Sequence, residues 1–207
     1  MTNLLMRALD PIFGHPRGAL GRLGGALMAR GNAEQEQWAV TAAQIQPGQR
    51  VLVLGHGPGV GLALAAKEVG HTGHVVGVDP SQTMRQMAAT RCAAQIREGI
   101  VELRTGTAEE TNCESASIDA AISVNNVMLW DLEAGLDELA RVLRVGGTLV
   151  ITVHRHVLGH SPEDLRQTAE RAGFVLVSLN LRDRRFNSPA AELIARITDP
   201  STADSPH

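Results

Sequence analysis

The chain of 207 residues is poor in aromatic side chains and in cysteine. It has no tyrosine, three phenylalanines and two tryptophans, so tyrosine is excluded as a general acid and few rings can hold a planar ligand. Its two cysteines, Cys92 and Cys113, lack metal-ligand spacing with histidine and suit a reducing compartment. The core must therefore be built from Ala, Val, Leu and Ile, and we expect no metal site.

The chain also lacks a strong charge of one sign and long apolar runs. Its net charge of −3 gives no reason to expect nucleic acid as a partner. Its apolar runs are much shorter than the roughly 20 residues that span a membrane. Arg7 and Asp10 fall in an N-terminus without a signal-peptide core. We expect one cytoplasmic protein with one sizeable core, no nucleic acid and no membrane as partners.

The most informative segment is an apolar run followed by glycines, VLVLGHGPGVG over residues 51–61. Residues 51–54 predict a buried strand. Three glycines follow at the point where that strand must turn, namely Gly55, Gly57 and Gly59. Glycine permits positive φ and leaves no Cβ in the way of a ligand.

A helix, a second strand and an acid come next. Residues 63–69 predict a helix, whose first N–H groups can face a polar or anionic group. Residues 74–78 predict the second strand, and Asp79 at its end is placed to accept bonds from two ribose hydroxyls. This order predicts the nucleoside-binding half of a doubly wound sheet.

The glycine spacing favours one kind of nucleoside. A dinucleotide fingerprint needs G-x-G-x-x-G, whereas the spacing from Gly55 is G-x-G-x-G-x-G. Pro58 also removes an N–H donor that a pyrophosphate would use. The segment resembles the S-adenosylmethionine loop of class I methyltransferases, commonly (D/E)-x-G-x-G-x-G.

The later segments agree with that family, and the resemblance covers about residues 35–197. The matching segments are an acid leading into a helix (79–84), an adenine-contacting turn (106–109), a fourth strand (118–126), and a helix, glycine turn and fifth strand (139–151). The resemblance implies an α/β fold with a doubly wound, seven-stranded, mostly parallel sheet, an antiparallel last strand and an N-terminal helical cap. It also implies S-adenosyl-L-methionine as cofactor.

The resemblance assigns cofactor contacts residue by residue. The loop glycines would cradle the cofactor, Asp79 would hold its ribose, and Ala108 and Glu109 would border its adenine. The full predicted set is Gly55, His56, Gly57, Gly59, Asp79, Pro80, Met84, Ala108, Glu109 and Asn125.

The chain departs from the family at one position. The residue two before Gly55, often an acid that helps hold the loop or the methionine ammonium, is Val53. His56 also stands where the family often has a small residue or cysteine. Either backbone groups bind the cofactor without that acid, or the fold has lost methyl transfer.

The remaining chain divides into three parts. Residues 1–33 form an N-terminal helical lid or dimer segment, with helical spacing over 1–9 and 17–29. Residues 34–198 form the methyltransferase domain, and 199–207 a flexible tail. Within the domain we predict helices over 34–44 and 161–172, and strands over 98–103, 118–124 and 148–154. A final hairpin is predicted from 174–181 and 191–197.

Catalytic candidates follow the fourth and fifth strands, because doubly wound sheets bind ligands at strand carboxyl ends. Asn125 and Asn126 can orient a substrate, or Asn125 can fix a turn. Trp130 can cover adenine or pack under a helix. His154 and His156, on one face of the strand, are the best general bases, since imidazole titrates near neutrality. Alternatively, these two histidines are exposed residues that cap the end of the strand, or they form a poor metal site together with His160.

We expect a methyltransferase acting on a small molecule. The resemblance is to the ubiquinone/menaquinone-type and natural-product branches, so the context would be secondary metabolism. Two alternatives stay open. One is another reaction on this fold, such as cyclisation or elimination, with or without the cofactor; the other is a non-catalytic sensor subunit. A homodimer through the N-terminal helices is a further hypothesis.

Overall fold

The computed structural model describes residues 18–158, 161–183 and 189–198. One seven-stranded sheet, in the order β3-β2-β1-β4-β5-β7-β6, forms its centre. The strands are β1 (Arg50–Leu54), β2 (His74–Val78), β3 (Val101–Arg104), β4 (Ile118–Val124), β5 (Leu143–His154), β6 (Phe174–Arg182) and β7 (Ala190–Ile197). Neighbouring strands from β3 to β5 are parallel, whereas β7 is antiparallel to both β5 and β6. The predicted fold class is confirmed.

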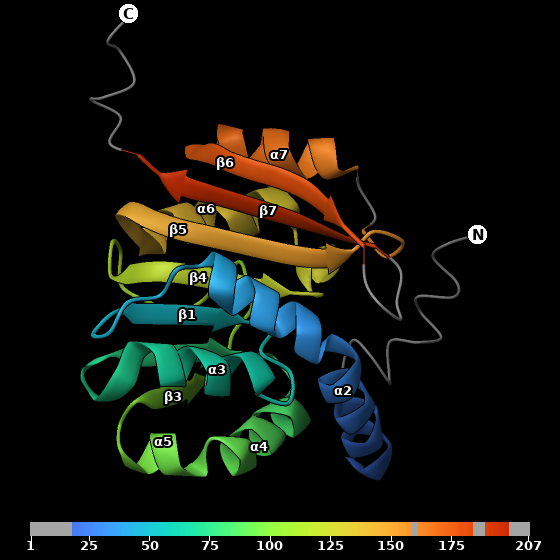
Figure 1. Cartoon of the computed structure of the whole chain (residues 1–207), viewed down its shortest axis with the longest axis vertical. Coiled ribbons are helices and arrows are strands. Elements are labelled where there is room, and N and C mark those ends of the chain that lie inside the picture. The colour runs from blue at the N-terminus through green and yellow to red at the C-terminus, as the bar shows by residue number, and fades with distance from the viewer. Residues whose placement is uncertain (1–17, 159–160, 184–188, 199–207) are drawn as a thin grey trace, which may run out of the picture.

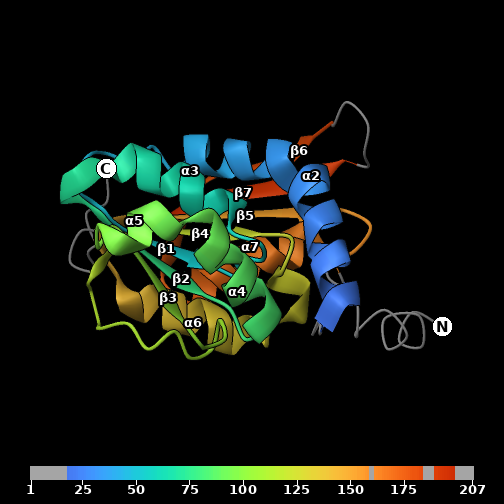
Figure 2. The same ribbon diagram turned by 90° about the horizontal axis from the view of Figure 1, so that it is seen from below.

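Helices cover both faces of the sheet (Figure 1). The α-helices are α2 (Gly18–Ala42), α3 (Val60–Val69), α4 (Gln82–Arg91), α5 (Ala93–Arg97), α6 (Leu132–Val142) and α7 (Pro162–Arg171); the short 3₁₀ turns are η2 (Gly70–Thr72) and η3 (Val127–Leu129). Figure 2 shows α2 and α3 on one side of the sheet and α6 on the other.

Alternation along the strands produces two separate hydrophobic cores. On β1, Val51 and Val53 pack with buried residues of α2, α3 and α4, whereas Leu52 and Leu54 pack with those of α6 and α7. Successive side chains of a strand point to opposite faces. Val53 therefore faces the α2–α3 side of the sheet.

The strand order places a switch point between β1 and β4. From β1 the chain proceeds outward through β2 to β3, and then returns to β4 on the other side of β1. Ligands of doubly wound sheets bind outside the carboxyl ends of the strands at such a point. The fold therefore brings together the glycine loop after β1, Asp79 after β2 and Asn125 after β4.

Several local predictions are confirmed. Strands β2 and β4 have the predicted bounds, and β6 and β7 form the predicted hairpin. Helix α7 begins with a complete capping box between Ser161 and Asp164, with Pro162 in its first turn. Gly173 follows this helix with φ of 94°, the left-handed conformation that ends helices.

The starts of two strands were predicted wrongly by three residues or more. The strand predicted over 98–103 begins at Val101, because α5 ends at Arg97 and Gly99 turns the chain with φ of 74°. The strand predicted over 148–154 begins at Leu143, because Leu143 already pairs with Ile118 before a shift in register. In both cases tertiary pairing decides where the strand starts.

The helices predicted over 17–29 and 34–44 are one continuous helix, α2. Glycines weaken an isolated helix by about 1 kcal/mol each, but α2 contacts α3, α4, β4 and β5, and Ala39 and Val40 are buried there. Packing overrides propensity. The proposed boundary at residue 33 falls inside this helix, and the lid or dimer role stays a prediction. Residues 1–17 and 199–207 lie outside the described part of the chain.

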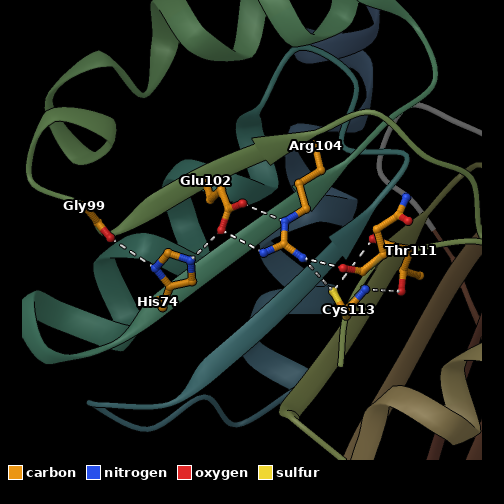
Figure 3. Close-up of polar contacts among 7 residues, drawn as sticks. His74, Gly99, Glu102, Arg104, Thr111 and Cys113 are labelled. Carbon is orange, nitrogen blue, oxygen red and sulfur yellow. Dashed lines mark hydrogen bonds and ion pairs between the residues drawn. The ribbon is translucent and has the colours of Figure 1, made fainter. Parts of the chain in front are cut away.

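Charged side chains line the edge strand β3. Glu102 lies between His74 and Arg104, accepting a hydrogen bond from Arg104 Nε at 2.7 Å (Figure 3). Arg104 also donates to the carbonyl oxygen of Asn112 at 2.8 Å. Charged residues on an edge strand oppose pairing with another chain. This network is therefore structural, and it lies at the outer edge of the sheet.

Candidate functional site

The turn after β1 has the backbone conformation that its glycines permit. Gly55, Gly57 and Gly59 have φ of 55°, 53° and 86°. The Gly55 N–H donates to the carbonyl oxygen of Val78 at 2.8 Å, so the turn is tied to β2. A Cβ on Gly55 would collide with the Asn126 amide, whereas one on Gly57 would meet nothing within 4 Å. The loop is closely packed at Gly55 and open at Gly57.

Asp79 faces this loop from the end of β2. Its carboxylate is buried, and Oδ2 accepts the Gly57 N–H at 3.0 Å while Oδ1 accepts the Ser81 N–H at 2.8 Å. Each carboxylate oxygen can accept a second hydrogen bond. The arrangement therefore fits a diol held beside a glycine loop.

His56 is buried within the loop. Its Nδ1 lies 2.8 Å from the Gly57 carbonyl oxygen, which favours the tautomer with the proton on Nδ1. Burial lowers the pKa of the imidazole, although the neighbouring Asp79 opposes that effect. Nε2 is buried and has no hydrogen-bond partner in the described structure. A neutral Nε2 of this kind is an acceptor available to a bound ligand.

The predicted adenine turn lies against the start of α6. Ala108 is buried, and Glu109 accepts a hydrogen bond at Oε1 from the Asp131 N–H at 2.8 Å. Trp130 packs over Gly135, where an added Cβ would lie 3.1 Å from the indole. Trp130 thus packs against helix α6, which agrees with the second of the two roles considered for it. Pro80 is exposed and Met84 is buried in α4.

Asn125 joins three elements. It has φ of 54°, and its Oδ1 accepts from Gln35 Nε2 at 3.1 Å and from the His154 N–H at 2.9 Å. Its Nδ2 donates to Gln35 Oε1 at 3.0 Å. The side chain therefore connects α2, β4 and β5, which matches the turn-fixing interpretation of this residue. Its predicted roles in catalysis and cofactor binding stay predictions.

Asn126 ties β4 to the glycine loop. Its Nδ2 donates to the Leu54 carbonyl oxygen at 2.6 Å, and its Oδ1 accepts from Ser123 Oγ at 2.7 Å. We predicted that Asn126 could orient a substrate, but we did not include it among the cofactor contacts. The double asparagine after a buried strand is the only sequence signal for it.

His154 and His156 lie together at the end of β5. Their ring centroids are 5.5 Å apart and the ring planes are inclined by 33°. His154 is half-buried, whereas His156 is exposed. Both lie at the end of β5, as predicted, and the backbone N–H of His154 donates to Asn125.

The metal alternative gains no support from the described residues, among which no three His, Cys, Asp or Glu side chains form a metal-binding group. His160, like His15 and Arg17 of the predicted lid, lies outside the described part of the chain. Within the described ranges, no helix has the length and apolar character needed to cross a membrane.

Comparisons with known proteins agree with this geometry. A family described as a methyltransferase domain matches residues 51–147. The chain is 29% identical to an uncharacterized methyltransferase, YdaC, of Bacillus subtilis over 83% of this chain and 93% of that protein. It is 31% identical to a demethylmenaquinone methyltransferase of Desulfitobacterium hafniense over 54% of this chain and 45% of that protein.

A solved structure agrees in fold. A SAM-dependent methyltransferase from Aquifex aeolicus superposes with a TM-score of 0.69 at 18% identity, over 79% of this chain and 89% of that one. The chain is therefore similar in sequence to methyltransferases over residues 51–147, and it has the fold of a SAM-dependent methyltransferase. The chain spans 28% to 52% of the length of five further curated relatives that it matches.

The chain also has site features that sequence reasoning missed, and they lie on α2. Gln35 and Glu36 are buried polar residues of that helix. Glu36 precedes Ala39 and Val40 by three and four residues, so all three share one helix face. A glutamate within an apolar helix face was the signal that could have found it.

Proposed function

We propose that this protein transfers a methyl group from S-adenosylmethionine to a small organic acceptor. The observation that carries the proposal is the buried Asp79 carboxylate facing the Gly57 N–H at 3.0 Å across the carboxyl ends of β1 and β2. The orphaned Nε2 of His56 and the open space at Gly57 fit a ligand beside it. When bound, the cofactor supplies an electrophilic methyl group on a sulfonium.

The residues of the chain have separate roles in this proposal. Asp79 accepts the two ribose hydroxyls, and the glycine loop with His56 contacts the nucleoside and amino-acid parts. Ala108 and Glu109 border the adenine, with Pro80 and Met84 nearby. Asn125 fixes the ends of β4 and β5. His154 or His156 takes the proton that the acceptor loses, because imidazole is basic near neutral pH.

A small acceptor is supported by two observations. About seven residues separate the end of β5 at His154 from the start of α7 at Pro162, which leaves no room there for an inserted substrate domain. Relatives of the chain are named for small substrates, namely demethylmenaquinone and arsenite. Quinol-type acceptors are therefore the first to screen, with secondary metabolism as the proposed context.

Calorimetric titration with S-adenosylmethionine and S-adenosylhomocysteine tests the cofactor side. We expect micromolar binding by the wild-type chain and at least a tenfold loss in Asp79→Ala, because the ribose would lose both acceptors. Asp131→Ala, which changes the cap of α6 instead, is the matched control. Wild-type protein that is folded but binds neither ligand would contradict the proposal.

Product analysis tests the reaction. A methyltransferase releases one S-adenosylhomocysteine per methylated product, and His154→Ala or His156→Ala should reduce that turnover by about 10²-fold or more if the ring is the base. Product formed from the acceptor without S-adenosylhomocysteine would instead identify the non-methylating alternative that Val53 motivates. Unchanged turnover in both histidine variants would exclude them as bases.

A further inference from the structure

Glu36 is a buried acid without a hydrogen-bonded or ionic partner among the described residues. Its side chain is 9% exposed, and no hydrogen bond or ion pair joins it to any described residue. Burial alone raises its pKa to about 8. A carboxyl group buried without a hydrogen-bonded partner costs stability, so such groups are uncommon unless they have a function.

The carboxyl group of Glu36 lies at the first turn of α3. A Cβ built on Gly61 would collide with Glu36 Oε2 and would lie 3.3 Å from Glu36 Cδ. Gly61 thus leaves space that the carboxyl group occupies. The first N–H groups of a helix and its dipole favour negative charge at this place.

Val53 borders the same space. Its Cγ1 would lie 3.7 Å from that Cβ on Gly61, and its side chain belongs to the core between the sheet and α2. Val53 is also the position at which related loops often have an acid. The carboxyl group of Glu36 therefore reaches the neighbourhood of the missing acid from a different element.

We infer that Glu36 of α2 replaces the acid absent at position 53 and pairs with the ammonium group of the methionine moiety of S-adenosylmethionine. The inference rests on the proposed function. The ammonium would supply the buried carboxylate with the cation that the described structure lacks. It would also make α2 part of the cofactor site.

Among the described side chains, no other charged group provides that cation. The elements packed most extensively against α2 are α3, α4, β4 and β5, and Arg182 of β6 stacks on Trp38 of α2. Their charged and titratable side chains are Lys67 and Glu68 on α3, Arg85 and Arg91 on α4, Cys92 after it, Asp119 on β4, and Arg144 and His154 on β5; the described side chains of α2 itself add Arg30 and Glu34. None of them contributes to the shift in the pKa of Glu36, which burial alone causes.

The test compares two ligands that differ only in the ammonium group. Wild-type chain and Glu36→Gln are titrated with S-adenosylhomocysteine and with its deaminated analogue, which keeps the adenosine, the thioether and the carboxylate. We expect Glu36→Gln to lose at least tenfold in affinity for S-adenosylhomocysteine and less than twofold for the analogue. Glutamine has nearly the same shape and removes a buried acid, so circular dichroism should show a folded protein.

A second variant moves the acid back to β1. Adding Val53→Asp to Glu36→Gln should recover at least fivefold of the lost affinity, because both side chains border Gly61. Binding of S-adenosylhomocysteine at pH 7 should also release close to one proton in the wild-type chain and almost none in Glu36→Gln, as judged from titrations in buffers of different ionisation enthalpy.

The outcomes separate the two proposals. Glu36→Gln that binds S-adenosylhomocysteine as tightly as the wild-type chain overturns the inference and leaves the proposed function intact. Equal losses for the two ligands also overturn it, since they indicate a structural role. Wild-type chain that binds neither ligand overturns the proposed function and the inference together.

Discussion

The two halves of the carboxyl edge are built differently. At β1 and β2, the glycine loop is held by nearby residues: Gly57 and Asp79 are 22 positions apart in the sequence. At β4 and β5, the contacts come from a distant helix: Gln35 and Asn125 are 90 positions apart. The residues of the first half lie close together in the chain, so a short window of sequence contains the whole motif. The second half exists only after α2 has packed on the sheet.

The two halves also differ in how their polar groups are satisfied. Loop and strand share backbone hydrogen bonds, and Asp79 accepts two backbone N–H groups. The other half depends on side-chain amides, in particular the paired bonds between Gln35 and Asn125. Backbone contacts tolerate side-chain change, whereas paired amides do not. Replacement of a single side chain should therefore disturb the half next to α2 more readily than the half built on backbone groups.

Gly55→Ala should have the largest effect and break the loop half. A left-handed φ costs a residue with a Cβ roughly 1–2 kcal/mol, and overpacking against Asn126 adds about 1–3 kcal/mol. We expect the free energy of unfolding to fall by about 3–4 kcal/mol in urea denaturation, with more than tenfold weaker cofactor binding. Gly57→Ala has the same left-handed backbone strain, but its added Cβ would meet open space, so the free energy of unfolding should fall by only about 1 kcal/mol. Equal losses would contradict this packing.

The pH dependence of stability tests the helix half. The folded-state pKa of Glu36 is raised from 4.5 to about 8. The contribution of this group to the free energy of unfolding is therefore fully present below pH 4.5 and is lost as the pH rises through 8. Between pH 5 and pH 8, the ligand-free chain should lose about 3 kcal/mol of unfolding free energy from this group. Glu36→Gln should lack that loss and be more stable than wild type at pH 8. Parallel profiles for the two proteins would contradict the assignment.

Asn126→Ala and Gln35→Ala compare the two halves directly. Asn126→Ala leaves the buried carbonyl of Leu54 and the hydroxyl of Ser123 without their partner, which should cost about 2 kcal/mol and weaken cofactor binding. Gln35→Ala should cost about 1 kcal/mol. Its main effect should be faster amide hydrogen exchange in α2, while exchange in the loop stays unchanged. Faster exchange at both places in either variant would show that the halves are one cooperative unit.

Glu102→Gln at the β3 edge should have the smallest effect. The hydrogen bond from Arg104 is the main cause that lowers the pKa of Glu102. The contribution of Glu102 to the free energy of unfolding is therefore present above pH 4.5 and is lost as the pH falls through the lowered value. The side chain is 43% exposed, and solvent screening limits the loss to about 0.5 kcal/mol or less. Cofactor affinity should not change. A loss above 2 kcal/mol would mean that this edge supports the site.

Local sequence signals determined much of the fold. Alternating apolar residues and glycines located β2 and β4, and the Ser161-Pro162 signal located the start of α7. Family resemblance added the number of strands, the antiparallel last strand and the expected cofactor. Where the prediction failed, as at Leu143 and along α2, the deciding term was contact with another element. Propensity over a short window does not contain such contacts.

The sequence by itself determined the glycine loop, Asp79 and the class of fold, because these depend on residues close together in the chain and on conformations that only glycine adopts readily. Only the tertiary structure decided what completes the site. It turned residues 18–42 into one helix, paired Gln35 with Asn125, and brought the Glu36 carboxyl group to Gly61 beside Val53. The physical reason is that burial and charge depend on neighbours in space, which a single sequence does not specify.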